Sequence, residues 1–188
     1  MWFGTNDGLN RYNGHDFKVY HNEIDSEMSL TSNQILKIFE DSNENLWVLT
    51  SNGVNKLNPD RNNVIQYSNL NEKDSLSGNK LTDMLITSEG KILLATSNGI
   101  DVYNKDENRF EPFLDEETLR SPMVYSLEED EFGYIWVGTE EGVDVVNKNG
   151  LIKNSFIYEG ENNNKLREPV KKIYYDKDGV LWISTDSL

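Results

Sequence analysis

The sequence predicts an all-β fold built of β-propeller blades, and three observations support this prediction. An apolar run, a threonine, a short turn and a glycine recur in the same order along the 188 residues. The recurring runs, such as LWVLT and IWVGT, are short, aromatic and β-branched, and Gly, Asn, Asp and Ser bound them, as is usual for strands and turns. No window of helical length shows a sustained period of 3.6 residues.

The recurrence has a regular spacing, which defines a tandem repeat. The threonines lie 45, 46, 43 and 46 residues apart, and the glycines lie 45, 46 and 43 residues apart. The repeated positions are Trp2, Trp47, Leu93, Trp136 and Trp182 in the apolar runs, then Thr5, Thr50, Thr96, Thr139 and Thr185, then Gly8, Gly53, Gly99 and Gly142. HEAT units, armadillo units and four-stranded propeller blades all have periods in the forties, and the strand-like composition favours the blades.

Each blade is expected to contain four antiparallel strands. The apolar run is the second strand and is apolar at nearly every position, as expected of a strand covered on both faces. Trp47 and Trp136 are therefore expected to be buried between neighbouring blades. The fourth strands are expected at Val64–Tyr67, Phe110–Phe113 and Ser155–Tyr158.

The expected first strands raise one question of conformation. Their apolar residues lie three apart, as in Ile35 with Ile38 and Val124 with Leu127, whereas a flat strand has a period of two. A single helical turn or a bulged strand would each explain this spacing. We favour the bulge, because the turn that follows has hairpin chemistry and needs a strand on either side.

The repeats predict one propeller segment over residues 1–188, with about four blades' worth of strands. We expect full blades at 34–68, 80–114 and 123–158, a partial blade at 1–20 without its first strand, and a partial blade at 170–188 with only its first two strands. This pattern suggests a piece of a larger ring, although the two partial blades could instead join in a closed four-bladed ring. In the first case the incomplete blades would expose apolar faces and open edges, so we expect self-association.

Composition excludes several classes of partner. The 33 acidic and 18 basic residues give a net charge of -15, which argues against binding to nucleic acid or to an anionic membrane. The absence of cysteine excludes disulfides and thiolate metal sites. No apolar run approaches the ~20 residues that span a bilayer, and Met1 leads directly into WFGT without a signal-peptide pattern. We therefore expect no direct membrane contact, and composition leaves the compartment open.

The segments WFGTNDGLNRYNG, DSNENLWVLTSNGVNKLN and DEFGYIWVGTEEGVDVVN resemble two-component regulator propeller repeats, and the resemblance covers essentially the whole chain. Leu93, Ala95 and Leu49 depart from the family pattern without disturbing its register. The resemblance implies part of a seven-bladed propeller in the periplasmic sensor region of a Bacteroides-type hybrid two-component system, with a histidine kinase elsewhere in the full-length protein. It implies recognition of polysaccharide breakdown products, an oligosaccharide ligand, and contacts with neighbouring blades and domains.

No catalytic, cofactor-binding or metal-binding residue is predicted, and the ligand-binding residues are not assigned. The loops starting at Asp130 and Asp176 could open a calcium loop, but they lack the later ligands and are interpreted as turns. The repeated threonines are interpreted as structural hydroxyls, and His15 and His21 lack a third metal ligand. The acidic clusters are interpreted as solvated rims. A non-catalytic sensor is the main hypothesis, with an interaction scaffold or a propeller lyase or hydrolase as alternatives.

Overall fold

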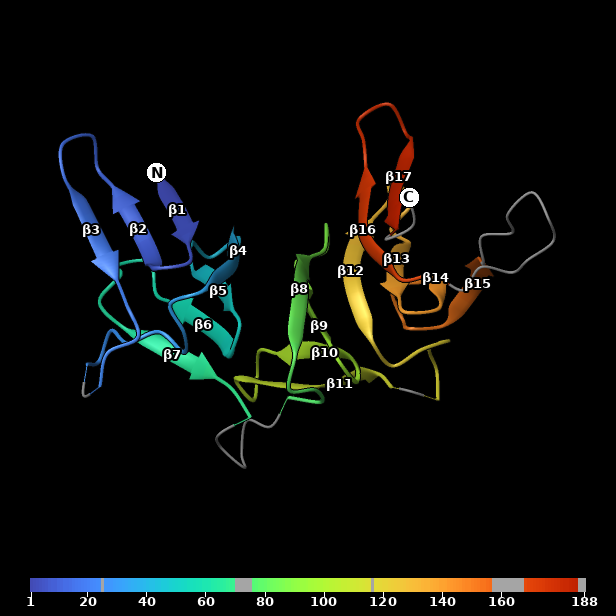
Figure 1. Cartoon of the computed structure of the whole chain (residues 1–188), viewed down its shortest axis with the longest axis horizontal. Helices are drawn as coiled ribbons and strands as arrows, with labels where there is room; N and C mark the ends of the chain where they lie inside the picture. The colour runs from blue at the N-terminus through green and yellow to red at the C-terminus, as the bar shows by residue number, and fades with distance from the viewer. Residues whose placement is uncertain (25, 70–75, 116, 157–167, 186–188) are drawn as a thin grey trace. The chain divides into compact units, whose positions relative to one another are not determined.

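The computed structural model describes residues 1–24, 26–69, 76–115, 117–156 and 168–185, and all regular structure in these residues is β-strand. The strands form antiparallel sheets of consecutive neighbours (Figure 1), which confirms the predicted fold class. The strands are β1 (Trp2–Thr5), β2 (Gly8–Tyr12), β3 (Phe17–Tyr20), β4 (Ile35–Glu40), β5 (Leu46–Thr50), β6 (Gly53–Leu57), β7 (Val64–Tyr67), β8 (Leu81–Ile86), β9 (Ile92–Thr96), β10 (Gly99–Asn104), β11 (Arg109–Leu114), β12 (Val124–Glu129), β13 (Ile135–Thr139), β14 (Gly142–Val146), β15 (Ile152–Phe156), β16 (Val170–Tyr175) and β17 (Leu181–Thr185).

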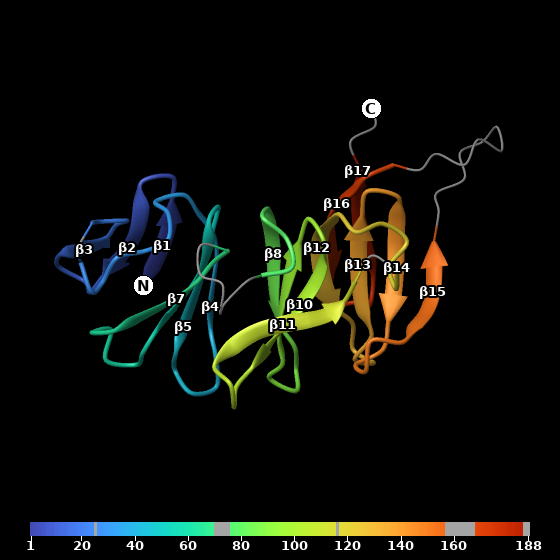
Figure 2. The same cartoon turned by 90° about the horizontal axis from the view of Figure 1, so that it is seen from below.

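The strands are distributed over two compact units. The first, Met1–Leu76, holds the three-stranded sheet β1–β2–β3 and the four-stranded sheet β4–β5–β6–β7. The second, Ser77–Leu188, holds the four-stranded sheets β8–β11 and β12–β15 and the pair β16–β17. Within the second unit, β12 lies between β8 and β16, as Figures 1 and 2 both show. The single continuous propeller segment over residues 1–188 stays a prediction.

The first strand of each sheet from β4 onward carries a bulge at the same position, and no described residue forms a helical turn there. The register shifts between Ile35 and Lys37, Leu81 and Asp83, Val124 and Ser126, and Val170 and Lys172. The residue inside each shift has no cross-strand partner; these residues are Leu36, Thr82, Tyr125 and Lys171. The extra residue explains why the apolar side chains lie three apart rather than two.

Sheets pack face to face within each unit, and two of the second strands are buried along their whole length. Every residue of β5 and of β9 is buried. Trp47 is fully buried, whereas Trp136 is only partly buried, against Val143, Val170 and Ile173. The prediction that both tryptophans are buried therefore holds for Trp47, whereas Trp136 is buried only in part. On β17, Trp182 remains 61% exposed.

One predicted strand begins earlier than expected. The structure places β15 at Ile152–Phe156 rather than at Ser155–Tyr158, and residues 157 and 158 lie outside the described residues. The chain reverses tightly after β14, because the amide of Asn147 donates to the carbonyl of Leu151 and the Asn147 side chain accepts from the amides of Asn149 and Leu151. This turn lets pairing with β14 resume at Ile152.

The repeated threonine and glycine close the two-residue turn between the second and third strands. The hydroxyls of Thr5, Thr50, Thr96 and Thr139 donate to the carbonyls of Gly8, Gly53, Gly99 and Gly142 over 2.9–3.1 Å. Each hydroxyl also accepts the amide two residues later. Gly99 and Gly142 have φ angles of 100° and 117°, which L side chains rarely adopt.

Replacing Gly99 by Ala should destabilise the chain more than replacing Gly90 by Ala. Both glycines have positive φ, but a Cβ at Gly99 would lie 2.1 Å from the Leu114 carbonyl oxygen, whereas a Cβ at Gly90 meets nothing within 4 Å. The φ strain alone should cost about 1–2 kcal/mol, and the clash at Gly99 should add about 1–3 kcal/mol. Urea unfolding of both variants measures the difference, and equal losses would contradict the role of the close approach.

Candidate functional site

An aspartate stands at the start of the hairpin turn between the first and second strands, and its carboxylate accepts hydrogen bonds from the same hairpin. Oδ1 of Asp130 accepts the amides of Phe132 and Tyr134, each at 2.9 Å, and Oδ2 accepts the indole Nε1–H of Trp136 at 2.9 Å. Asp41 and Asp176 make the equivalent hydrogen bonds, to Trp47 at 2.8 Å and Trp182 at 2.7 Å. This geometry supports the turn interpretation over the calcium loop.

The sheet without a tryptophan also lacks the aspartate. Leu93 occupies the tryptophan position on β9, and Thr87 stands six residues earlier, where the other sheets have Asp. The Thr87 hydroxyl still accepts the amide of Lys91 at 3.0 Å, so it keeps the turn contact without an indole to bind. Aspartate and tryptophan thus form one structural pair, which the sequence shows as a six-residue spacing.

The indole also affects the ionisation of Asp41 and Asp176. Burial acts to raise the pKa of Asp41, but hydrogen bonds from Trp47, Asn45 and Asn43 outweigh it and hold the pKa below its ordinary value. The hydrogen bond from Trp182 is the main cause of the lowered pKa of Asp176. Because the folded pKa values are lowered, this contribution to stability is present above the unfolded pKa and is lost as the pH falls through the folded pKa.

A second set of buried polar groups lies on the third strands, two residues after the repeated glycine. Asn55, Asp101 and Asp144 are at most 1% exposed. Each holds the loop that leads into the first strand of its own sheet. Asn55 accepts the amide of Thr31 at 2.9 Å, Asp101 that of Ser77 at 2.9 Å, and Asp144 that of Arg120 at 2.8 Å.

Each of these loops also contains a buried leucine, so the loop and the third-strand side chain that binds it form one structural unit. Leu30, Leu76 and Leu119 are buried immediately before the loop amides that the third-strand side chains bind. The sequence analysis missed this unit, although the recurring Gly-apolar-Asn/Asp triplet and the Ser-Leu or Thr-Leu pairs were available as a signal. Burial raises the pKa of Asp101, and the hydrogen bonds from Ser77 offset this only in part.

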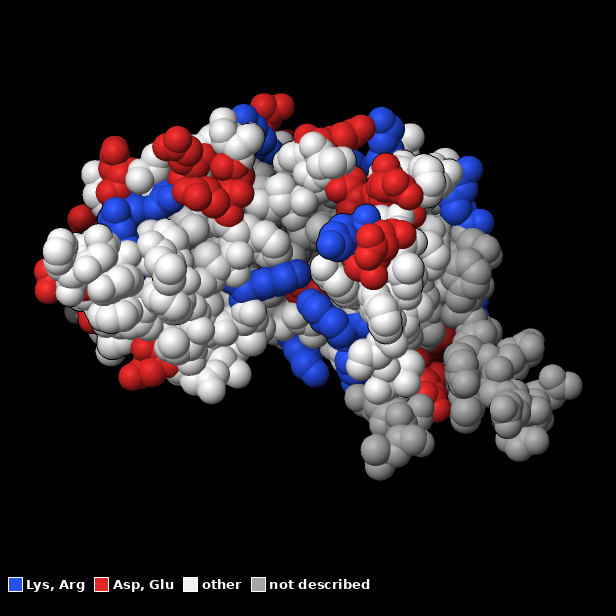
Figure 3. Space-filling model, turned by 90° about the horizontal axis from the view of Figure 1, so that it is seen from above, with Lys and Arg blue, Asp and Glu red and all other residues white. Residues whose placement is uncertain are grey.

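The remaining polar candidates do not converge on a metal site. His21 Nε2 lies 3.1 Å from the carbonyl oxygen of Asp7, and Asp115 accepts the hydroxyl of Thr118. Across the described parts of the chain, no group of three or more His, Asp or Glu side chains could hold a metal ion. Both acidic and basic side chains appear on the face in Figure 3.

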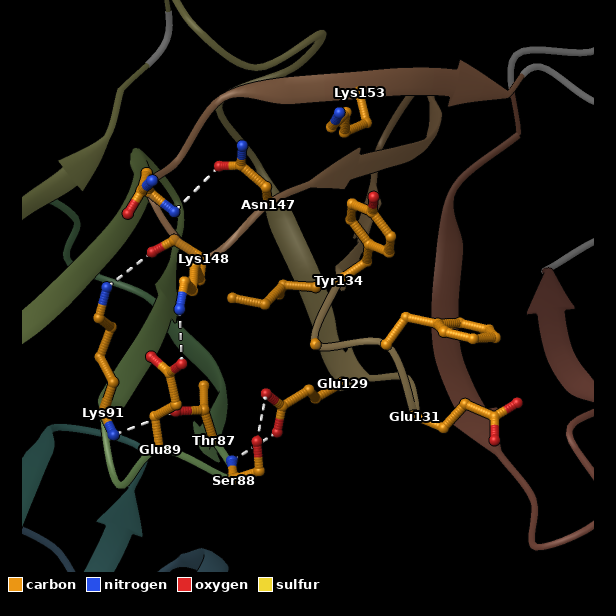
Figure 4. Close-up of a pocket in the computed structure, with 14 residues that line it drawn as sticks. Thr87, Ser88, Glu89, Lys91, Glu129, Glu131, Tyr134, Asn147, Lys148 and Lys153 are labelled. Atoms are coloured by element: carbon orange, nitrogen blue, oxygen red, sulfur yellow. Dashed lines mark hydrogen bonds and ion pairs between the residues drawn. The ribbon is translucent and has the colours of Figure 1, made fainter.

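A pocket of about 500 Å³ lies in the second unit, between the turns of two adjacent sheets. The turn between β8 and β9 contributes residues from Thr87–Lys91, and the turn between β14 and β15 contributes Asn147–Asn149. The end of β12, the turn after it and the start of β13 contribute residues from Glu129–Ile135. Lys153 of β15 completes the lining, and Figure 4 shows it with Tyr134 on one side of the pocket. Its size falls within the range of small-molecule sites.

Polar bridges between the two sheets form one wall of the pocket (Figure 4). Lys148 Nζ lies 2.8 Å from Glu89 Oε1, and Lys91 Nζ donates to the carbonyl of Lys148 at 2.8 Å. The Ser88 amide and hydroxyl donate to Glu129 at 2.5 and 3.0 Å. The hydrogen bond between Lys148 and Glu89 lowers the pKa of Glu89 and raises that of Lys148, so both groups stay charged at neutral pH. The wall presents charged and hydrogen-bonding groups to a polar ligand.

The sheet order and the shared turns define a protein built of β-propeller repeats. The model of the two component regulator propeller family matches residues 29–52, 118–141 and 166–187. These three segments are two-component regulator propeller repeats, as the sequence motifs predicted. Comparison with curated protein sequences yields no match.

Solved structures share the fold over nearly the whole chain. One is the extracellular domain of BT3049 from B. thetaiotaomicron, described as a hybrid two-component system, whose sequence is 25% identical to this chain. Its structure aligns with a TM-score of 0.79, and the alignment covers 98% of this chain and 26% of the BT3049 chain. The extracellular domain of BT4673 from the same organism is 19% identical, with a TM-score of 0.58 over 97% of this chain and 33% of its own. Virginiamycin B lyase from Staphylococcus aureus is 13% identical, with a TM-score of 0.67 over 97% of this chain and 58% of its own.

The chain thus spans between a quarter and a third of the length of these two extracellular domains. The lyase shares the fold alone, at an identity too low to carry its chemistry across. The described residues contain no helix long and apolar enough to span a membrane.

A double-mutant cycle should reveal the coupling between Asp41 and Trp47. Trp47→Leu should cost at least about 2 kcal/mol, because it opens space in the core, and Asp41→Thr should cost about 1–3 kcal/mol, because it leaves the indole N–H unpaired. The double variant has the same residue types as the natural pair Thr87 and Leu93. Its loss of unfolding free energy should therefore be smaller than the sum of the two single losses by about 0.5–3 kcal/mol. Chemical denaturation measures all four proteins.

The exposed tryptophan supplies the control for this cycle. Trp182→Leu should change stability by less than about 1 kcal/mol, because 61% of Trp182 is exposed. Strict additivity at Asp41 and Trp47 would show that the indole and the carboxylate act independently.

Asp101→Asn should stabilise the chain at neutral pH by about 1 kcal/mol, because it removes the charge of a buried carboxylate while an amide can imitate the Asn55 contacts. A raised folded pKa means that protonation of Asp101 adds stability below the unfolded pKa, and this is lost as the pH rises through the folded pKa. The advantage of Asn should therefore shrink as the pH is lowered. Asp101→Ala leaves the Ser77 amide unpaired and should destabilise instead, and urea unfolding at several pH values tests both variants.

Proposed function

We propose that this chain is part of the extracytoplasmic recognition region of a two-component sensor and that it binds a ligand without chemical conversion. The observation that carries this proposal is the match of three segments to two-component regulator propeller repeats. The likeness to the extracellular domain of BT3049 supports it, at 25% identity and a TM-score of 0.79. These findings also support a location outside the cytoplasm, which we propose to be the periplasm.

We propose an oligosaccharide from polysaccharide breakdown as the ligand and the pocket beside Tyr134 as its site. The lining supplies lysines, carboxylates, a serine and asparagines, and sugar hydroxyls both donate and accept hydrogen bonds. The phenyl ring of Phe132 is 76% exposed at the rim and offers an apolar surface to a sugar ring. The ion pairs in the wall hold its turns in place before a ligand arrives.

The arrangement of side chains favours binding over catalysis. The carboxylates at the pocket are engaged: Glu129 accepts two hydrogen bonds from Ser88, Glu89 binds Lys148, and Glu131 accepts the Tyr175 hydroxyl at 2.9 Å. A catalytic group needs a nucleophile or base with an orienting partner beside the reacting atom. The described pocket residues contain no such set.

Isothermal titration of the chain with xylotriose, cellotriose, galactotriose and trigalacturonate tests the proposal. We expect saturable binding of at least one of these sugars, with the sugar recovered unchanged. Lys153→Ala should weaken that binding by about five- to tenfold, because a hydrogen bond from a charged group is worth about 1.5 kcal/mol or less in such a partly open site. Lys105→Ala, on the turn between β10 and β11, is the matched control and should bind as the original chain does.

Two outcomes would contradict separate parts of this proposal. If none of the four sugars binds, the ligand class is wrong. If a bound sugar is cleaved, and cleavage is lost when Glu129 or Glu131 is replaced by Gln, the propeller acts as an enzyme.

A further inference from the structure

The sheet β1–β2–β3 in the first unit carries two cations directly opposite each other. Trp2 of β1 pairs with Arg11 of β2, and Arg11 pairs with Lys18 of β3. The three strands lie side by side in Figure 1, and directly paired residues project from the same face of a sheet. Like charges in this position destabilise a strand pair, so the juxtaposition of Arg11 and Lys18 needs an explanation.

Aromatic rings support both cations from below. The Cζ carbon of Arg11 lies 5.7 Å from the centroid of the Trp2 ring, and Nζ of Lys18 lies 4.8 Å from the centroid of the Tyr20 ring. The two ring centroids are 5.7 Å apart, and both rings pack in the buried cluster around Leu9. A π face attracts a cation through its quadrupole and brings no negative charge. The rings therefore fix the position of the cations and leave their charge in place.

The donors of these two cations are not used inside the described part of the chain. Arg61, whose guanidinium also lies against the Trp2 ring at 5.8 Å, donates to Glu40 Oε1 at 2.8 Å and to backbone carbonyls. In contrast, neither Arg11 nor Lys18 forms a side-chain hydrogen bond or an ion pair with any described residue. Both keep their N–H donors available to a group from outside.

A small pocket opens beside the two cations at the hairpin between β2 and β3. Its volume is about 210 Å³, and its lining residues are Arg11, Asn13, Asp16, Phe17 and Lys18. The Asn13 side chain accepts the amide of Asp16 at 2.8 Å, which holds the turn in shape. The lining thus contains two cations and one carboxylate. The pocket is smaller than a typical small-molecule site, so it fits one charged group of a ligand rather than a whole oligosaccharide.

We propose that Arg11 and Lys18 bind the oxyanion group of a ligand, a carboxylate, a sulfate or a phosphate. The planar guanidinium can donate to two oxygens of such a group at once, and the ammonium adds a charge-assisted hydrogen bond. A bound oxyanion also offsets the repulsion between the two cations. This site belongs to the first unit and the pocket beside Tyr134 to the second, so the proposal is independent of the proposed function.

Amide NMR of the chain, titrated with sodium sulfate, sodium phosphate and sodium acetate, tests this site. Sodium chloride at equal ionic strength is the control. We expect saturable shifts concentrated at residues 11–18 with at least one oxyanion and none with chloride. Because the chain has a net charge of -15, its overall field repels anions, and saturation therefore reports a local site. The anion that saturates at the lowest concentration identifies the class of oxyanion.

Three substitutions in the pocket separate a binding site from general attraction to cations. Arg11→Gln and Lys18→Gln should each weaken the binding about five- to tenfold, because each removes a charge-assisted donor. Asp16→Asn should tighten it about two- to fivefold, because it removes the one carboxylate of the lining. Lys105→Gln, the matched control on the turn between β10 and β11, should leave it unchanged.

Absence of saturable shifts with all three oxyanions, or equal shifts with chloride, would overturn the proposal. An equal loss of affinity in Lys105→Gln would also overturn it, since any lysine would then suffice. Thermal unfolding checks that each variant folds, and if Arg11→Gln does not, Lys18→Gln and Asp16→Asn still decide. Sugar binding that depends on Lys153, without oxyanion binding at residues 11–18, would support the proposed function and refute this second site.

Discussion

The structure depends on the need of each sheet to cover both faces of its second strand. In β5 and β9 every residue is buried, and a single sheet cannot achieve this, because one face of each strand would meet water. Adjacent sheets therefore pack against one another, with Leu93, Val124 and Val137 in one cluster and Leu9, Ile35 and Val48 in another. The turns and loops are arranged around this packing: threonine hydroxyls close the hairpins, and aspartates hold the indoles.

The buried polar groups make this packing specific. An apolar interface alone would allow one sheet to slide over the next, but Asn55, Asp101 and Asp144 each fix the loop that enters their own sheet. The Ser126 hydroxyl accepts the amide of Ile173 at 3.0 Å, and Asp83 accepts that of Leu127 at 3.1 Å, so side chains of one first strand bind the backbone of the next. These hydrogen bonds can form only in one register, since buried donors without partners are costly.

The sequence predicted the fold because its signals are local and repeated. The threonine spacing gave the blade period, and the three-residue spacing of Ile35 and Ile38 correctly indicated a bulged strand. The partial burial of Trp136 was not predictable, because burial depends on what packs against the residue rather than on its own strand. The lining of the pocket was also missed, since Lys91, Tyr134 and Lys153 belong to three separate hairpins and share no motif. The ammonium of Lys171 lies 3.5 Å from the centroid of the Tyr125 ring, and this contact depends on the packing of two sheets, which spacing alone does not show.

The absence of a cross-strand partner at each bulge has a consequence for how such repeats can diversify. A residue paired in the ladder and packed between sheets is constrained by its neighbours, so most changes there reduce stability. Leu36, Thr82, Tyr125 and Lys171 escape the pairing constraint, and they already include apolar, hydroxyl, aromatic and cationic side chains on one backbone geometry. Gene duplication of a blade would thus copy a scaffold together with one open position. Selection can then alter the chemistry of these positions one residue at a time while the fold stays intact.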